Sequence, residues 1–209
     1  MKVSKSKLKQ KNILVIGDLI LDQYLFGKVE RISPEAPVPI LNILKTEERL
    51  GGAANVALNC KTLGCNVEIV SVIGNDLDGQ KLVEKLEEKN IICFIEKNNS
   101  YKTVKKTRLI GNYQQILRMD DEQIPPKITN KTFNNFLKRF KKSDIIIFSD
   151  YAKGVLNELP DLIQKVKDSN KICLIDPKGS DIRKFKGADV ITPNYKEIEM
   201  LVGSYDNKK

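Results

Sequence analysis

The sequence predicts an α/β fold in which a mostly parallel central sheet carries helices on both faces and a small β-sheet lid stands beside it. Short continuous apolar runs, typical of strands buried on both faces, alternate with stretches of helical periodicity. This alternation favours right-handed crossovers and therefore parallel pairing. A proline-containing segment of alternating apolar residues interrupts the pattern early in the chain, and it predicts strands outside the main sheet.

The amino-terminal half predicts three strands of the main sheet, two helices and the lid. The expected strands are residues 12–17, 67–73 and 91–96, and the expected helices are residues 52–63 and 79–89, with Gly64 just after the first. Segments at about 24–48 and 101–120 predict the lid, because Pro34, Pro37 and Pro39 exclude central strands and Gly111-Asn112-Tyr113 predicts a hairpin turn.

The carboxyl-terminal half continues the alternation. The expected strands are residues 145–148, 171–175 and 188–191, and the expected helices are residues 131–142, 157–169 and 195–202. Phenylalanines at helical spacing in the first of these helices indicate a core-facing stripe. Asn157 is the predicted cap of the second helix, with Pro160 in its first turn.

Size and composition fit one domain, residues 12–209, preceded by a basic tail at residues 1–11. The 209 residues are 41% hydrophobic, and the net charge of +9 favours anionic partners such as phosphorylated metabolites. The other lysines are scattered, so we expect no nucleic-acid binding. Four cysteines without a Cys-x-x-Cys pair, and no histidine, argue against zinc and favour a reducing compartment. No run suits a signal peptide or membrane span, so we expect a cytoplasmic protein without a membrane partner.

Polar side chains follow the carboxyl ends of four predicted strands, where ligands of open α/β sheets bind. These pairs are Asp18 with Asp22, Asp150 with Lys153, Asp176 with Lys178, and Asn194 with Glu197. One such pair means little, since a capping aspartate explains it equally well. Four pairs around one sheet edge predict a ligand cleft.

A paired glycine, Gly51-Gly52, opens the helix predicted at residues 52–63, with Asn55 in its first turn. Glycines at a helix entrance allow close approach of a ligand to the backbone, and free amides there favour anionic or oxygen-rich groups. A tight packing loop is the alternative reading. Loss of sugar affinity in Asn55→Ala would separate the two.

The spacing Gly51-Gly52-x-x-Asn55-x-Ala57, followed by Gly64 and Gly74, resembles the amino-terminal signature of the ribokinase-like (PfkB) carbohydrate kinases. The resemblance runs from about residue 12 to about residue 203. Within that family, the run Arg-Ile-Ser-Pro-Glu-Ala-Pro-Val-Pro at residues 31–39 is similar to the heptose kinases of lipopolysaccharide synthesis. Other matching stretches are residues 17–22, 47–57, 149–154, 176–179 and 192–197.

This resemblance implies a ribokinase-like three-layer fold and ATP- and Mg²⁺-dependent phosphorylation of the anomeric hydroxyl of heptose 7-phosphate. By position, the implied substrate-binding residues are Asp18, Asp22, Gly51, Gly52, Asn55 and Asp150. The implied ATP-binding residues are Lys178, Asn194, Tyr195, Lys196 and Glu197, with Glu197 holding Mg²⁺ through water. Arg31, Arg108 and Arg118 are candidates for gripping the 7-phosphate, and exposed surface arginines are an equally supported reading.

The family's catalytic base is an aspartate in a Gly-Ala-Gly-Asp motif, and the 209 residues contain no such motif. The sequence therefore assigns no catalytic residue and predicts a fold that lacks its carboxyl-terminal part, with a partly exposed face around Ile191 and Val202. The family's nucleotidyltransferase domain is likewise not expected. A remnant that binds sugar phosphate without catalysis is the alternative function, and a homodimer through the β-lid is left open.

Overall fold

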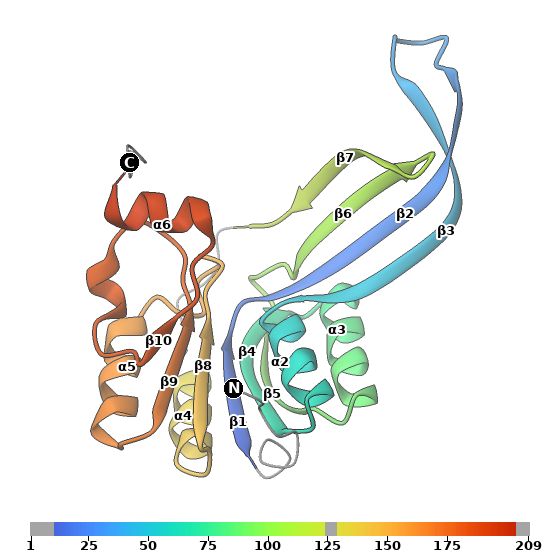
Figure 1. The fold of residues 1–209 in the computed structure, drawn as a ribbon. Helices are drawn as coiled ribbons and strands as arrows, with labels where there is room; N and C mark the ends of the chain where they lie inside the picture. The colour runs from blue at the N-terminus through green and yellow to red at the C-terminus, as the bar shows by residue number, and fades with distance from the viewer. Residues whose placement is uncertain (1–10, 124–128, 204–209) are drawn as a thin grey trace.

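A computed structural model describes residues 11–123 and 129–203 and shows two sheets with helices packed around one of them (Figure 1). The strands of the larger sheet are β1 (Asn12–Gly17), β4 (Asn66–Gly74), β5 (Ile92–Asn98), β8 (Ile145–Ser149), β9 (Ile172–Asp176) and β10 (Val190–Ile191). Their order is β10-β9-β8-β1-β4-β5, and every pairing is parallel. The predicted parallel sheet is confirmed. The basic tail predicted at residues 1–11 lies outside the described residues except for Lys11.

Helices lie on both faces of this sheet and divide the core into two. The helices are α2 (Ala53–Thr62), α3 (Leu77–Glu88), α4 (Asn130–Phe140), α5 (Leu159–Asp168), α6 (Tyr195–Val202) and the short 3₁₀ helix η1 (Ile182–Phe185). One core cluster joins α2 and α3 to β1 and β4, and the other joins α4 and α5 to the opposite face. The phenylalanine stripe of α4 is core-facing as predicted, since Phe136 and Phe140 are buried. No helix in the described part of the chain is long and apolar enough to cross a membrane.

The predicted lid is a four-stranded sheet that stands away from the body (Figure 1). Its strands are β2 (Leu19–Ile32), β3 (Pro39–Gly52), β6 (Val104–Gly111) and β7 (Gln114–Asp121), in the order β3-β2-β6-β7. The first hairpin is longer than the sequence predicts, because β2 begins directly after Asp18 and β3 continues to Gly52. Pro34 and Pro37 lie in its turn and Pro39 is the first residue of β3, all positions that spare the hydrogen-bond ladder.

Three local predictions need correction. The helix predicted from Asn157 begins at Leu159 after Glu158, because residues 154–158 form turns; Pro160 does lie in its first turn. The helix predicted from Gly79 begins at Leu77, since the Asp76 side chain accepts the Gly79 N–H as an N-cap. The last strand is only two residues long.

The face near the end of the described chain is partly exposed, as predicted. Val202 is 63% exposed and Met200 is 50% exposed, while Val190 on the edge strand β10 is 45% exposed. Cys60, Cys65 and Cys173 are buried as small apolar residues, also as predicted.

Candidate functional site

Asp18 lies at the junction of β1, the lid and the segment that follows β8. It is 1% exposed, and its carboxylate accepts three backbone N–H groups, from Tyr151 at 2.9 Å, Lys153 at 3.0 Å and Val155 at 3.1 Å. Burial raises the pKa of the Asp18 carboxyl, although these three hydrogen bonds and the Lys153 charge oppose the rise. The structure therefore commits both carboxylate oxygens of Asp18 to fixing the segment that follows β8.

The paired glycines form the end of β3 rather than a loop. Gly52 has φ +55°, and a Cβ there would lie 2.4 Å from the Asp18 carbonyl oxygen, so only glycine fits. A Cβ on Gly51 would lie 2.4 Å from Asp22 Oδ2, so a side chain there would displace the Asp22 carboxylate. Gly52 is also the N-cap of α2 and provides no side-chain cap, and the first amide of the helix, Ala53 N–H, donates to the Asp18 carbonyl oxygen at 2.9 Å. The amides that follow it in the first turn have no side-chain cap.

Asp22 belongs to the lid strand β2, which corrects its predicted place at the end of β1. The chain turns at Asp18 alone, so the residues after it already run into the lid. Asp22 and Asn55 nevertheless line the same pocket, which has a volume of about 540 Å³ and lies between the base of the lid and helices α2 and α3. The other lining residues are Tyr24, Glu48, Arg49, Leu50, Leu58, Lys85, Glu88 and Lys89. Oxygen acceptors and cationic side chains thus share one cavity.

A basic cluster lies on one face of the lid. Arg108 donates from Nη1 to Asp22 Oδ1 at 2.6 Å. Two guanidinium groups make cation–π contacts with the Tyr24 ring, with the Cζ atoms of Arg49 and Arg108 lying 4.3 Å and 5.1 Å from the ring centroid. Arg118 is the register partner of Arg108 across the β6–β7 ladder. These five residues come from all four lid strands, with Asp22 and Tyr24 both on β2, and they lie on one face.

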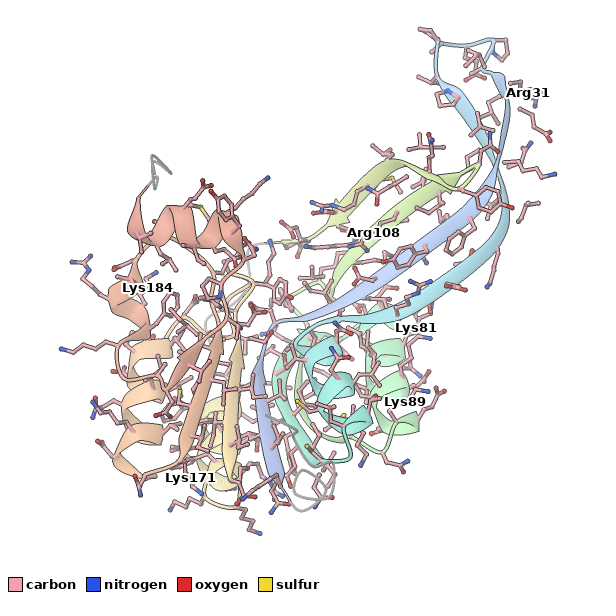
Figure 2. The ribbon with its side chains drawn as sticks, in the orientation of Figure 1. Arg31, Lys81, Lys89, Arg108, Lys171 and Lys184 are labelled. Atoms are coloured by element: carbon pink, nitrogen blue, oxygen red, sulfur yellow. The ribbon has the colours of Figure 1, made fainter. Side chains whose placement is uncertain are left out.

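Arg31 does not join this cluster. It lies nine residues beyond Asp22 on β2, which corresponds to about 30 Å at the rise of a strand. Figure 2 shows Arg31 near the far tip of the hairpin and Arg108 much closer to the body. Of the three arginines proposed to grip a phosphate, the structure therefore brings together Arg108 and Arg118 only.

Asp150 lies at the carboxyl end of β8 and is partly buried. Burial, supported by the nearby carboxylates of Asp18 and Asp176, raises the pKa of Asp150 to about 6. A backbone hydrogen bond from Ala152 opposes this rise. The neighbouring Tyr151 has a raised pKa for the same leading reason, burial, with Asp176 and Asp22 among the charges that add to it. Carboxylates of the body and of the lid thus both act on the Tyr151 hydroxyl.

The predicted nucleotide segment forms the start of α6. Asn194 and Glu197 make a reciprocal capping box, in which Glu197 N–H donates to Asn194 Oδ1 at 3.0 Å and Asn194 N–H donates to Glu197 Oε2 at 2.9 Å. Lys178, from the segment after β9, donates to Glu197 Oε1 at 3.1 Å. Burial pulls the pKa of Glu197 upward, but the hydrogen bonds from Asn194 and Lys178 outweigh it and the pKa lies below its usual range. Tyr195 and Lys196 are exposed on the same turn.

Within residues 11–123 and 129–203, no group of three or more Cys, His, Asp or Glu side chains is arranged to hold a metal ion. Glu197 is the only carboxylate that the sequence assigns to Mg²⁺. Each of its oxygens accepts one hydrogen bond and keeps a lone pair. Because Mg²⁺ retains several waters and takes one or two carboxylates plus phosphates, a single carboxylate acting through water fits its chemistry.

The sequence did not identify all the residues that line the pocket. Tyr24 and Arg49 belong to it, as do Lys85 and Lys89 of the α3 region. Period-two alternation would have placed Tyr24 on the Asp22 face of its strand, and Lys85 and Lys89 are one helical turn apart. Their meeting with Asn55 depends on how the lid sits on α2 and α3, which no local pattern encodes.

Two curated bacterial proteins resemble this chain over nearly all of its length. The bifunctional protein HldE of Coxiella burnetii (strain Dugway 5J108-111) is 41% identical over 206 residues, covering 97% of this chain and 43% of the relative. The HldE protein of Pasteurella multocida is 38% identical over 205 residues, covering 98% of this chain and 43% of the relative. The chain therefore spans less than half the length of these relatives.

Solved structures share the fold at low sequence identity. A ribokinase from Arabidopsis thaliana, complexed with ribose and ATP, has a TM-score of 0.72 at 15% identity and covers 92% of this chain and 63% of that one. The tetrameric inhibited form of phosphofructokinase-2 from Escherichia coli has a TM-score of 0.70 at 18% identity and covers 91% and 64%. The ribokinase-like fold expected from the sequence is confirmed, and the chain represents about two thirds of it.

The model of the pfkB family carbohydrate kinases matches residues 10–209. This match covers more than nine tenths of the chain, and the two curated relatives agree with it over the same region. The glycine pair, the lid and the parallel sheet described above all lie within the matched residues. The chain belongs to the pfkB family of carbohydrate kinases.

Proposed function

We propose that this chain binds heptose 7-phosphate and is the sugar-holding part of a kinase that phosphorylates its anomeric hydroxyl with ATP. The proposal rests on the pocket of about 540 Å³. Its lining combines the oxygen acceptors of Asp22 and Asn55 with the cationic side chains of Arg49, Lys85 and Lys89. Carboxylate and amide oxygens suit sugar hydroxyls, whereas cationic side chains suit a phosphate. A neutral pentose or hexose would not use the cationic part of this lining.

Each assigned residue has a distinct task in this proposal. Asp22, Asn55 and the backbone at Gly51 and Gly52 hold the sugar hydroxyls, with Asp150 at the end of β8. Asp18 acts by holding the segment after β8 in place. Arg108 and Arg118 face the 7-phosphate from the lid. The basic lid thereby selects the phosphorylated end of the substrate.

The nucleotide is proposed to bind at Lys178 and the first turn of α6. Lys178 and the first turn of α6, from Asn194 to Glu197, face the ATP phosphates, because cations and helix N-termini both favour anions. Mg²⁺, bound to the phosphates and reached by Glu197 through water, neutralises charge that develops during phosphoryl transfer. These residues position the nucleotide, and none of them is proposed as the base.

Calorimetry with heptose 7-phosphate, ATP and duplex DNA tests the proposal directly. We expect heptose 7-phosphate to bind and DNA not to bind at physiological salt. The absence of sugar phosphate binding would overturn the proposal, and salt-sensitive DNA binding in its place would identify the chain as a nucleic-acid binder.

An ATP-dependent phosphorylation assay separates a kinase from a sugar-phosphate-binding remnant. The assay is run with this chain alone and again with a fragment that carries the Gly-Ala-Gly-Asp motif of a relative. Loss of a base lowers rates by about 10²–10⁴ and loss of anion-hole donors by about 10²–10³, so we expect turnover only in the second case. Binding without turnover in both cases would favour the remnant.

We also propose that two copies associate through the lid in the cytoplasm. The lid carries large apolar side chains that are at least two fifths exposed, namely Ile32, Val38, Ile43, Leu44, Tyr113, Ile116, Leu117 and Met119. Patches of this kind mark association surfaces. Sedimentation of the chain and of a Leu44→Asp variant tests this, because the variant should be monomeric if the lid forms the interface. A monomeric wild-type chain would overturn it.

A further inference from the structure

An ion pair joins Asp22, which lines the pocket, to Arg108, which lies beside the pocket on β6 and outside its lining. Arg108 Nη1 lies 2.6 Å from Asp22 Oδ1, and the two side chains are only 20% and 19% exposed. The second oxygen of Asp22 lies over the backbone of Gly51. In the ligand-free protein, each charge is therefore the other's partner.

We propose that this ion pair makes the pocket selective for ligands that carry hydroxyl groups and a phosphate together. The inference rests on the proposed function and deepens it by assigning the source of specificity. A sugar phosphate replaces both partners at once, because its hydroxyls donate to Asp22 while its phosphate accepts from Arg108. A neutral sugar that hydrogen-bonds to Asp22 leaves Arg108 without an anionic partner. Inorganic phosphate that binds Arg108 leaves Asp22 without a cationic partner.

The surroundings make an unpaired charge costly. Both side chains are about four fifths buried, and removing one partner from a buried ion pair is strongly unfavourable. Binding sites discriminate most strongly when the wrong ligand leaves a buried polar group unpaired. We therefore expect heptose 7-phosphate to bind at least about 10²-fold more tightly than either unphosphorylated heptose or inorganic phosphate.

The lid is built to keep Arg108 in place after Asp22 releases it. The Tyr24 ring lies under both Arg108 and Arg49, so a cation–π contact remains when the ion pair opens. Arg118 follows directly across the β6–β7 ladder. The guanidinium groups of Arg49 and Arg118 lie beside Arg108, and each is paired with a carboxylate of its own strand, Arg49 with Glu47 at 2.5 Å and Arg118 with Asp120 at 2.8 Å. Arg108 is therefore the guanidinium that a phosphate contacts when it replaces Asp22.

The decisive probe is inorganic phosphate, measured by calorimetry on the wild type and on Asp22→Asn. If Asp22 competes with phosphate for Arg108, the variant should bind phosphate about tenfold more tightly than the wild type. The double variant with Arg108→Ala should lose the gain, which locates the phosphate at Arg108 rather than elsewhere on a basic surface.

The chain offers a matched control on the other face of the lid. Lys105 Nζ lies 2.6 Å from Asp78 Oδ2, and these side chains are 24% and 18% exposed. Lys105 and Arg108 lie on opposite faces of β6, because alternate strand residues do. Asp78→Asn makes the same change of net charge as Asp22→Asn, and we expect it to leave the phosphate affinity within about twofold of the wild type.

A second measurement uses Arg108→Ala with heptose 7-phosphate and unphosphorylated heptose. The affinity difference between the two sugars should shrink by at least about tenfold, and thermal melts confirm that both variants fold. If Asp22→Asn gains no more phosphate affinity than Asp78→Asn, the ion-pair inference is wrong even where heptose 7-phosphate binds. If heptose 7-phosphate fails to bind but the gain appears, the sugar assignment is wrong and the charge competition stands.

Discussion

Lys178 and Glu197 pair with each other, with Lys178 Nζ 3.1 Å from Glu197 Oε1. The family resemblance assigns one to the nucleotide phosphates and the other to Mg²⁺. The Glu197 side chain is 8% exposed and the Lys178 side chain is 44% exposed, so the lysine is the member that is free to turn toward a ligand. A magnesium–nucleotide complex would supply both opposite charges at once.

Replacing Lys178 tests this part of the site. We expect Lys178→Ala to weaken ATP binding about tenfold, since a charge-assisted contact to a phosphate is lost. The Glu197 capping box should hold α6 in place, so the thermal midpoint should change little. Calorimetric titration with Mg²⁺-ATP gives the affinity.

Lys186→Ala is the control for this titration. Lys186 is exposed and lies just after η1, and its removal makes the same charge change. Equal losses of affinity in the two variants would mean that only net charge matters and would contradict the assignment of Lys178.

Asn55→Ala should lower the affinity for heptose 7-phosphate at least about tenfold. The exposed Asn55 side chain lines the pocket, and Asn59, one helical turn later, is exposed outside its lining. Removing an exposed side chain on a helix changes stability by no more than about 0.5 kcal/mol. Asn59→Ala is therefore a matched control that should leave affinity unchanged. If Asn55→Ala and the wild type bind with equal affinity, the paired glycines serve packing and not ligand binding.

Asp150→Asn should stabilise the protein in a pH-dependent way. Burial raises the pKa of Asp150 from 3.8 to about 6, so the folded state holds this proton more tightly than the unfolded state does. Stability is therefore lost as the pH rises from about 4 to about 6. The variant escapes this loss, and we expect a gain of about 1–3 kcal/mol at pH 7 and none at pH 4. Urea unfolding at the two pH values measures the difference, and an equal effect at both would contradict the role of burial.

Asp18→Asn should release the segment after β8. Asparagine offers one acceptor oxygen where three backbone N–H groups now donate, and its own N–H₂ faces one of them. Buried donors without partners cost about 1–3 kcal/mol each. We expect hydrogen exchange to accelerate at Tyr151, Lys153 and Val155, with less change in β8 itself. Unchanged exchange at these three amides would show that Asp18 does not hold the segment.

The sequence was most informative where local pattern decides structure. Apolar runs such as residues 12–17 and 67–73 correctly predicted strands of the parallel sheet, because burial on both faces leaves a continuous signature. The lid was also predicted, since Pro39 and its neighbours exclude a central strand. The prediction of Asn157 as the cap is wrong because turns precede α5, and the Val155 N–H at their start donates to Asp18.

The site was predictable in its parts but not in its assembly. Glycine spacing identified Gly51, Gly52 and Asn55, whereas the pairing of Asp22 with Arg108 requires β2 and β6 to lie parallel. Arg31 and Arg108 were indistinguishable in sequence, and only the length of the hairpin separates them. Long-range strand pairing carries no local signature of this kind.

Two of the connections between the lid and the body are very short. Asp18 alone separates β1 from β2, and β3 passes directly into α2. Any tilt of the lid must therefore rotate the backbone at Asp18 and Gly52 and displace the first turn of α2. Ligand occupancy at the pocket should consequently change the position of the distant hairpin tips. Because the chain contains no tryptophan, a Tyr113→Trp substitution at the β6–β7 turn would give a single tryptophan whose fluorescence reports this motion.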